Sequence, residues 1–362
     1  MDYYYILAPV LALALGWLLT PRVRWLAVKI GAVDYPDPRK VHDGAMPRLG
    51  GLAVYLAFVI AVVAFRDLTP QVLGLLTGAT LVMLVGAVDD IRGLSPRVKL
   101  AGQIIAALTI IPFGIEVHYI TNPLTGGLLF LGILSIPLTV FWVVAVTNAV
   151  NLIDGLDGLA GGVASIAALT MAAVAWTQWS RFGVSDMPDM IILALILVAA
   201  VAGFLRYNFF PARIFLGDSG SMFLGFTLSV MAIMSMTKSA TAVSVIIPLV
   251  ILGVPLLDTF FAIIRRCCMQ RPIFQPDRQH LHHQLMAMGL NHRQTVLAIY
   301  ALSAFLGLNA LALNLVTSDQ ALILVAILAV SVIYLADRVG VLGLRRTRYQ
   351  APEEHKQRSS KM

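Results

Sequence analysis

The chain has 362 residues, of which 59% are hydrophobic and 12% are charged, whereas soluble globular proteins carry about 25% charged residues. This composition, with a mean hydropathy of +0.85, excludes a soluble globular domain, a disordered chain, a collagen-like fibre and a disulfide scaffold. A formal net charge of +7 often indicates nucleic-acid binding, but here membrane topology accounts for the basic residues, so we expect no nucleic-acid partner.

Eleven apolar segments approach the roughly 20 residues that a helix needs to cross a bilayer. They lie at 3–20, 49–65, 71–88, 98–115, 133–150, 159–178, 189–205, 220–236, 241–264, 294–315 and 320–336. We therefore predict an all-α polytopic integral membrane protein, with one transmembrane domain over residues 1–344 and a basic tail, 345–362, that is disordered. The first residues lack the basic region and cleavage site of a signal peptide, so the first span is expected to stay in the protein.

The basic residues predict the orientation of these spans. All 26 Lys and Arg residues except Arg66, Arg181 and Lys238 fall after odd-numbered spans or in the tail. Because loops rich in Lys and Arg stay in the cytoplasm, we expect the N-terminus outside the cell and the C-terminus inside. On the outer side, the alternation of apolar and polar residues within 115–132 predicts a short β-hairpin.

Polar side chains gather at five places, all at span ends that the basic residues assign to the cytoplasm. The pair Asp89 and Asp90 closes the third span, at the end of the helix dipole that disfavours carboxylates. Neighbouring carboxylates resist ionising together, so we expect a cation, either a metal or a lysine, to compensate them. The alternative for this pair is a solvated helix end.

The connection between spans five and six carries the most specific pattern in the chain. Asn148 and Asn151 share a face if the helix continues, and two glycines then permit a tight loop that presents Asp154 and Asp157. Amide and carboxylate oxygens are suited to Mg²⁺. The alternative is ordinary turn chemistry, with Asp157 as the N-cap of the next helix.

A glycine pair marks the entry to span two. Lys40 and Arg48 precede Gly50-Gly51, where a ligand or another backbone segment could approach closely. A basic interfacial anchor with a glycine hinge is the alternative for this segment.

A second turn lies before span eight, where Asn208 and Phe215 precede Gly217-Asp218-Ser219-Gly220. Such a turn at the start of a helix offers free backbone N–H groups to a phosphate and a carboxylate to a metal. An ordinary capping turn would have the same sequence.

The longest inside loop contains Arg278, His280, His282 and His283. Three imidazoles near an arginine suggest contact with phosphate. Zinc binding and a solvated basic loop are the alternatives, although no thiolate lies near enough in the sequence to favour zinc.

The predicted cytoplasmic surface therefore combines hard oxygen donors with basic groups and has no Walker or dinucleotide-binding motif. This combination is typical of metal-assisted phosphoryl transfer. Because the site lies at the level of lipid headgroups, we expect one substrate to be a lipid phosphate. A secondary transporter is an alternative, but it predicts inverted repeats and polar residues at the midplane, of which only Asp258 is present. A membrane scaffold with a polybasic tail is another, and it leaves the carboxylates unexplained.

At these motifs the chain resembles the polyprenyl-phosphate N-acetylhexosamine-1-phosphate transferases over nearly its whole length. Pro47-Arg48-Leu49-Gly50-Gly51, Asp154-Gly155-Leu156-Asp157-Gly158 and the spaced histidines resemble the WecA/TagO branch. Members of the MraY branch tend to have three contiguous histidines, so a phospho-MurNAc-pentapeptide transferase is the less favoured reading. The resemblance implies transfer of a sugar 1-phosphate from a UDP-N-acetylhexosamine to undecaprenyl phosphate, with Mg²⁺ or in its place Mn²⁺, at the cytoplasmic face of a bacterial inner membrane. It also implies a possible homodimer in the lipid bilayer.

The resemblance also implies roles for particular residues. It places Asp89, Asp90, Asp154, Asp157, His280, His282 and His283 in the catalytic region, Lys40, Arg48, Lys99, Asn208, Phe215 and Arg278 at the substrates, and Asn151 and Asp218 at the metal. Lys99 matches a contact to the lipid phosphate, and Asp90 is the predicted acceptor of that phosphate's proton or the residue that orients it.

Overall fold

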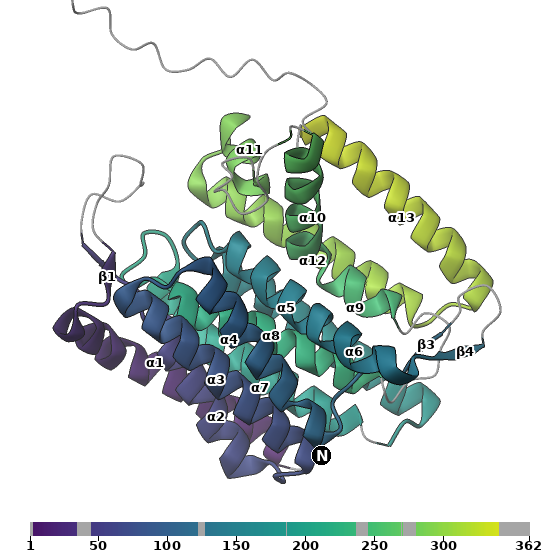
Figure 1. Ribbon diagram of the computed structural model, residues 1–362, viewed down its shortest axis with the longest axis horizontal. Helices are drawn as coiled ribbons and strands as arrows, with labels where there is room; N and C mark the ends of the chain where they lie inside the picture. The colour runs from purple at the N-terminus through teal and green to yellow at the C-terminus, as the bar shows by residue number, and fades with distance from the viewer. Residues whose placement is uncertain are drawn as a thin grey trace, which may run out of the picture.

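The computed structural model describes residues 3–34, 45–121, 127–185, 187–236, 245–268, 270 and 280–339, so Lys40, Arg278 and the tail 345–362 lie outside the described residues. The helices are α1 (Tyr4–Ile30), α2 (Gly50–Phe65), α3 (Pro70–Arg92), α4 (Pro96–Thr109), α5 (Ser135–Ile153), α6 (Leu159–Phe182), α7 (Met187–Asn208), α8 (Gly217–Met236), α9 (Ile246–Ile251), α10 (Gly253–Cys268), α11 (Leu281–Ala287), α12 (His292–Leu313) and α13 (Ser318–Val339) (Figure 1). Two short 3₁₀ turns, Ile111–Phe113 and Gly132–Leu134, flank the connection between α4 and α5.

The strands form two antiparallel pairs. β3 (Tyr119–Thr121) pairs with β4 (Leu128–Phe130), which confirms the predicted hairpin between α4 and α5. β1 (Val33–Asp34) pairs with β2 (Met46–Pro47), and this pair was not predicted. Figure 1 shows β1 at one end of the molecule and the β3–β4 hairpin at the other.

Nine helices in the described part of the chain are long and apolar enough to cross a membrane, so the protein is a multi-pass membrane protein. Helical structure follows from the apolar runs, because a segment in lipid must satisfy its backbone hydrogen bonds internally. The eleven predicted spans differ from these nine helices at two places. The helix α2 has 16 residues, or about 24 Å, which is less than the ~30 Å hydrocarbon core.

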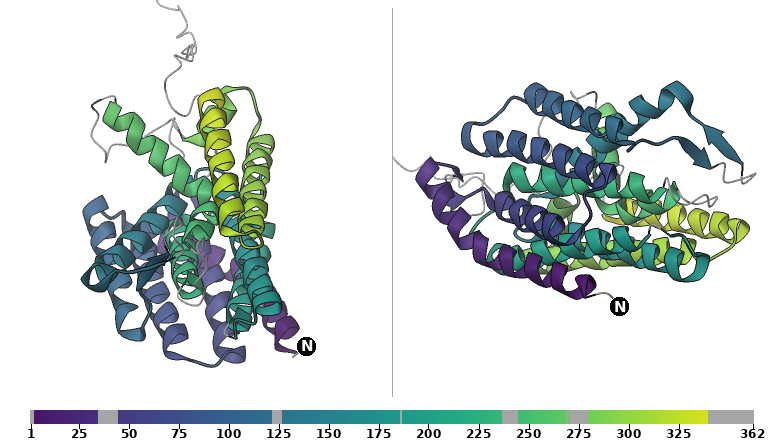
Figure 2. Two further views of the ribbon diagram at one scale, coloured as in Figure 1. Left: turned by 90° about the vertical axis from the view of Figure 1, so that its right-hand side faces the viewer. Right: turned by 90° about the horizontal axis from the view of Figure 1, so that it is seen from below.

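The ninth predicted span, 241–264, is not one helix but two, α9 and α10, which meet at Leu252 and Gly253. Pro255 explains the break, because its missing N–H cannot bond to Ile251 in a continuous helix but is tolerated in the first turn of a new one. The new helix α10 runs in a different direction from its neighbour α5 (Figures 1 and 2).

The first predicted span also ends at a different residue. We expected it to stop at residue 20, before Pro21, but α1 continues through that proline to Ile30. It ends where Gly31 adopts a left-handed conformation, with φ of 77°, and donates its N–H to the carbonyl groups of Ala27 and Val28.

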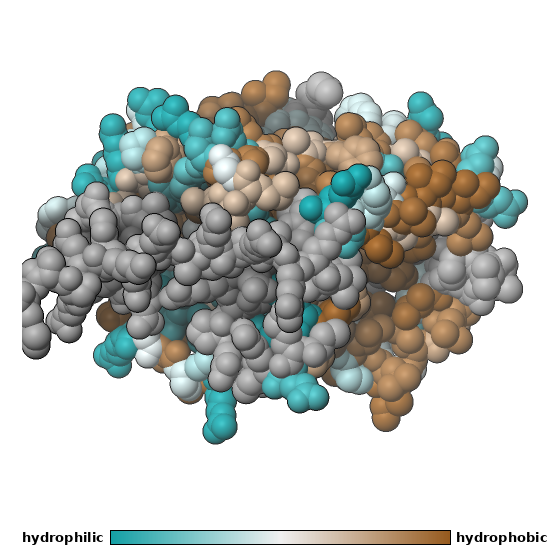
Figure 3. All heavy atoms as spheres, turned by 90° about the horizontal axis from the view of Figure 1, so that it is seen from above, coloured by the Kyte–Doolittle hydropathy of each residue, from teal (hydrophilic) through white to brown (hydrophobic). Residues whose placement is uncertain are grey.

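The helix α8 lies at the centre of the bundle and packs against α2, α3, α5 and α6. Its side chains Phe223 and Phe226 are fully buried, and Phe223 packs edge-on against Phe58 of α2. By contrast, α13 exposes Ile323, Ile327 and other apolar side chains, and hydrophobic residues cover much of the surface on its side of the molecule (Figure 3). Lipid would cover the apolar surface on the side of α13. The start of α8, by contrast, lies inside the bundle.

Candidate active site

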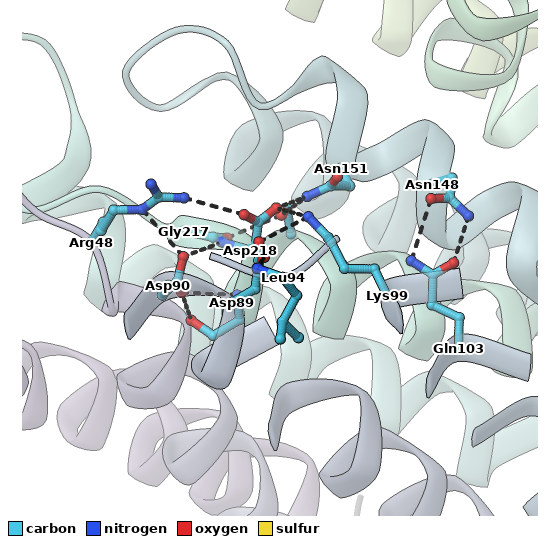
Figure 4. Close-up of polar contacts among 12 residues, drawn as sticks. Arg48, Asp89, Asp90, Leu94, Lys99, Gln103, Asn148, Asn151, Gly217 and Asp218 are labelled. Carbon is cyan, nitrogen blue, oxygen red and sulfur yellow. Dashed lines mark hydrogen bonds and ion pairs between the residues drawn. The ribbon is translucent and has the colours of Figure 1, made fainter. Parts of the chain in front are cut away.

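The first residues of α8 are held by a carboxylate from α3. Asp90, which is buried, accepts hydrogen bonds from the backbone N–H of Asp218 at 2.8 Å and from the backbone N–H and hydroxyl of Ser219 at 3.0 and 2.7 Å. The first N–H groups of a helix have no partner within it, so Asp90 acts as a cap supplied from another helix. Gly217 permits the turn, with φ of 76°. The oxygens of Asp90 are thus committed to fixing Asp218 (Figure 4).

The predicted cation beside the paired carboxylates is Lys99. Its Nζ lies 2.9 Å from Oδ2 of Asp89 and 3.1 Å from Oδ1 of Asp218. The connection between α3 and α4 is short, and Gly93, with φ of 69°, turns the chain so that Lys99 faces back toward Asp89. The other oxygen of Asp89 accepts the backbone N–H of Leu94. This arrangement excludes a merely solvated end for α3.

Arg48 provides a second cation on the opposite side of Asp218. Its Nε lies 3.3 Å from Asp90, and its two terminal nitrogens lie 3.2 Å from Asp218 and 3.7 Å from Asp34. Burial alone would lower the pKa of Arg48, but Asp90, Asp218 and Asp34 outweigh it and raise that pKa above its ordinary value. The guanidinium is therefore a permanent positive charge.

Backbone contacts place Arg48 at this position. Phe215 donates its N–H to the carbonyl of Pro47 and accepts the N–H of Gly50, and a methyl group on Gly51 would lie 2.0 Å from the nitrogen of Gly220. The predicted close approach at the glycine pair is therefore a contact between α2 and the start of α8. Here Phe215 contributes through its backbone.

The predicted pair of asparagines on α5 is divided between two tasks. Asn151 donates its amide to Asp218 at 2.5 Å and to the hydroxyl of Ser221 at 2.8 Å. Asn148 exchanges two hydrogen bonds with Gln103 of α4, at 2.6 and 3.3 Å (Figure 4). Asn151 therefore joins the charged cluster, and Asn148 locks α4 against α5.

The acidic loop, residues 154–158, follows α5. Burial and the charges of Asp218 and Asp90 raise the pKa of Asp154 to about 8, so its carboxyl is mostly protonated near pH 7. Asp157 accepts the N–H of Ala212 at 3.0 Å. It does not cap α6, since Gly158 occupies the N-cap position.

Asn208 also holds this loop rather than facing the charged cluster. It accepts the N–H of Gly158 and donates to the carbonyl of Ile214, both at 3.0 Å. In this structure Asn208 and Asp157 brace the acidic loop against the segment before α8.

The histidines reach the acidic loop from the other side. His282, which is buried, lies against Gly155, where a methyl group would be 2.6 Å from its Nε2. Burial, followed by the neighbouring His283, lowers the pKa of His282 to about 3, so its ring is neutral near pH 7. His283 is exposed, with its ring centroid 4.1 Å from that of His282. The histidine motif and the acidic loop thus form one site.

Several residues at the site were not assigned from the sequence. Ser219, Ser221, Asp34 and Gln103 contact the charged cluster or its supports. Ser219 lies in the turn singled out before span eight, but the sequence gave its side chain no role. The partners of all four residues come from distant parts of the chain, so spacing did not indicate these contacts. Asp258 did give a signal, as a carboxylate in an apolar run, and it contacts His280.

The residues at the cluster suit a magnesium ion that is shared with a substrate. Proteins commonly hold Mg²⁺ by one or two carboxylates, with substrate phosphates and water completing its shell. Asp218 carries a carboxylate, and the adjacent Asn151, whose amide nitrogen donates to it, carries an amide oxygen; both are ligand types that suit Mg²⁺. Among the described residues, no three His, Cys, Asp or Glu side chains form a group that could hold a metal by themselves.

Comparison with known proteins shows which family the chain belongs to. Residues 72–236 match the family described as glycosyl transferase family 4. The chain is 40% identical to a probable undecaprenyl-phosphate N-acetylglucosaminyl 1-phosphate transferase of Bacillus subtilis, over 93% of this chain and 92% of that protein. It is 34% identical to a decaprenyl-phosphate N-acetylglucosaminephosphotransferase of Mycolicibacterium smegmatis, over 79% and 75% of the two chains. A Salmonella typhi undecaprenyl-phosphate α-N-acetylglucosaminyl 1-phosphate transferase is 30% identical, over 78% and 77%.

With this similarity along nearly the whole chain, and with its polar clusters gathered at one end of a membrane bundle, the protein belongs to the polyprenyl-phosphate N-acetylhexosamine-1-phosphate transferases, within glycosyl transferase family 4.

Proposed function

We propose that this protein transfers N-acetylglucosamine 1-phosphate from UDP-N-acetylglucosamine to undecaprenyl phosphate and releases UMP. The observation that carries the proposal is the cluster in which Arg48 and Lys99 face Asp89, Asp90 and Asp218 at one end of the membrane helices. The names of the relatives favour this donor over a phospho-MurNAc-pentapeptide, and they favour a transferase over a transporter.

The reaction joins two anions. An oxygen of the lipid phosphate attacks the β-phosphorus of the UDP-sugar, the bond from that phosphorus to the α-phosphate oxygen breaks, and UMP leaves. One phosphoanhydride replaces another, so the enzyme's task is to lower the repulsion between the phosphates and to align them.

The side chains divide this task. Lys99 and Arg48 supply positive charge on either side of Asp218, and Lys99 is the contact for the lipid phosphate. We expected Asp90 to accept the proton of the lipid phosphate or to orient that phosphate, but both of its oxygens bind the start of α8. In this proposal Asp89, beside Lys99, takes the orienting role instead. The acidic loop with Asp157, Asn208 and Phe215 lies at the nucleotide end.

Asn151 and Asp218 are the residues that would hold Mg²⁺, with Mn²⁺ as a substitute, and such an ion would neutralise charge on the diphosphate. The histidines, with Lys40 and Arg278 from outside the described residues, would contact the diphosphate, sugar or nucleotide. The site would face the cytoplasm of a bacterial inner membrane, since the basic connections lie at the same helix ends. The predicted homodimer stays a prediction.

The proposal is tested by UMP release from the detergent-purified protein with undecaprenyl phosphate and UDP-N-acetylglucosamine, in Mg²⁺ or in EDTA. UMP that depends on both the lipid and Mg²⁺ is expected. UMP formed only from UDP-MurNAc-pentapeptide would overturn the donor, and no UMP from either sugar would overturn the reaction.

The orientation is tested separately with a membrane-impermeant maleimide. Cys267 is exposed near the end of α10. In a Cys268→Ser background it should react in inside-out vesicles and stay unreacted in right-side-out vesicles. The reverse pattern would place this end of the bundle outside the cell.

A further inference from the structure

A buried carboxylate on α10, Asp258, has no part in the reaction proposed above. Asp258 is 4% exposed and lies in the largely apolar first half of α10, well before the two arginines of its last turn. A carboxylate in such a position is costly unless it is paired and hydrogen-bonded. Its partners therefore indicate why it is there.

Both oxygens of Asp258 are used at the start of α11. Oδ2 lies 2.9 Å from Nδ1 of His280, and Oδ1 accepts the backbone N–H of Leu281 at 2.8 Å. His280 is the residue that precedes α11, it is 5% exposed, and its side chain provides no cap of its own. Asp258 thus supplies the cap from another helix and binds one defined edge of the imidazole ring.

These contacts extend to the rest of the histidine motif. α11 has only seven residues, too few to be stable by itself, so its direction depends on tertiary contacts such as the cap. The rings of His280 and His282 are parallel within 2°, with their centroids 6.1 Å apart, and His282 lies against Gly155 of the acidic loop. A single carboxylate on α10 therefore sets the placement of two histidines at the acidic loop.

We propose that Asp258 is a positioning residue for the histidine motif, which rests on the proposed function of that motif. It accepts a hydrogen bond from Nδ1–H of His280, which fixes the ring and leaves Nε2 as the nitrogen available to the substrate. Carboxylates that orient metal-bound imidazoles typically contribute about 10–100-fold to activity, and we expect an effect of the same order at His280. Asp258 contacts no substrate in this scheme and acts through His280.

The kinetic test compares Asp258→Asn and Asp258→Glu with Thr259→Val. Thr259 is the adjacent residue, and its buried hydroxyl has no hydrogen-bond partner among the described residues, so its removal controls for a polar change at the same depth in α10. We expect Asp258→Asn to lower kcat about 10–100-fold with the KM for undecaprenyl phosphate unchanged, Asp258→Glu to restore part of kcat, and Thr259→Val to match the parent protein.

A double-variant cycle separates positioning from a general loss of stability. The amide oxygen of Asp258→Asn can still accept the N–H of Leu281, so this variant chiefly removes the bond to His280. Adding Asp258→Asn to His280→Gln should therefore cause no further loss of kcat, at equal melting temperature in detergent. Losses that multiply, or a folded Asp258→Asn protein with the parent kcat, would overturn the proposal.

A measurement without turnover keeps this result separate from the proposed reaction. In protein labelled with ¹⁵N-histidine, the His280 signals are those that disappear in His280→Gln. They should show a protonated Nδ1 that shifts in Asp258→Asn and not in Thr259→Val. An unchanged His280 spectrum would refute the positioning role whether or not the parent protein releases UMP.

Discussion

Gly86 lies one helical turn before Asp90, where α3 meets the start of α8. A methyl group on Gly86 would lie 2.5 Å from the Cα of Ser219 and 2.6 Å from the carbonyl oxygen of Asp218. Carbon atoms in contact lie about 3.5–4.0 Å apart, so Gly86→Ala requires the two segments to separate by about 1 Å. That displacement moves Asp218 away from Lys99 and Asn151, and a shift of about 1 Å at a reacting group can cost about 100-fold in rate.

The same substitution changes stability much less. Overpacking costs about 1–3 kcal/mol, and the better helix propensity of alanine offsets about 1 kcal/mol of that. We therefore expect Gly86→Ala to purify as a folded protein with a small loss of stability and a kcat/KM for UMP release lowered about 100-fold.

The matched control is Gly161→Ala in α6, where the added methyl would meet only the side chains of Leu205 and Val201, at 3.1 and 3.3 Å. These side chains can move, so this variant should keep its activity. Parent-level activity in Gly86→Ala, or an equal loss in Gly161→Ala, would refute the reasoning that backbone packing sets the position of Asp218.

Three further predictions concern charged groups of the site. Asp90→Asn and Asp218→Asn should insert normally into the membrane but lose UMP release about 100-fold or more. Cys267→Ser, which changes an exposed thiol, should keep nearly all of its activity. Full activity of Asp218→Asn would remove its assignment to the metal. Lys99→Met should lower the rate of UMP release about 10²–10³-fold, and Lys99→Arg should keep part of that rate, because the ammonium lies between two carboxylates. Equal rates in the two variants would argue against a role for the charge of Lys99. Burial and the Asp218 charge raise the pKa of Asp154 to about 8, so its carboxyl takes up a proton on folding and stability should fall as the pH rises from about 4 to 8. Melting temperatures at pH 6 and pH 8 should therefore differ less in Asp154→Asn than in the parent protein, and an equal difference would contradict a protonated Asp154 carboxyl.

Local pattern was sufficient for the membrane class, for most helices and for the hairpin at β3–β4. Apolar runs near the length of a span leave the backbone no alternative to helix in lipid, and turn residues with alternation predict a hairpin. The pattern failed at the ninth span, where Pro255 restarts the helix, and at the end of the first span, because α1 tolerates Pro21. The sequence pattern predicted that Pro21 would end a helix and that Pro255 would not interrupt one, and both predictions were wrong.

By itself the sequence determined which polar motifs are candidates for the chemistry: the acidic pair, the acidic loop, the turn before α8 and the spaced histidines. Tertiary structure alone decided how they are used. Asp90 caps α8, Lys99 joins Asp89 to Asp218, and Asp258 binds His280. Each of these contacts joins segments that are separated along the chain. The physical reason is that a buried charge must find its partner in space, and the packing of glycine-lined helices, not the spacing along the chain, brings that partner within hydrogen-bonding distance.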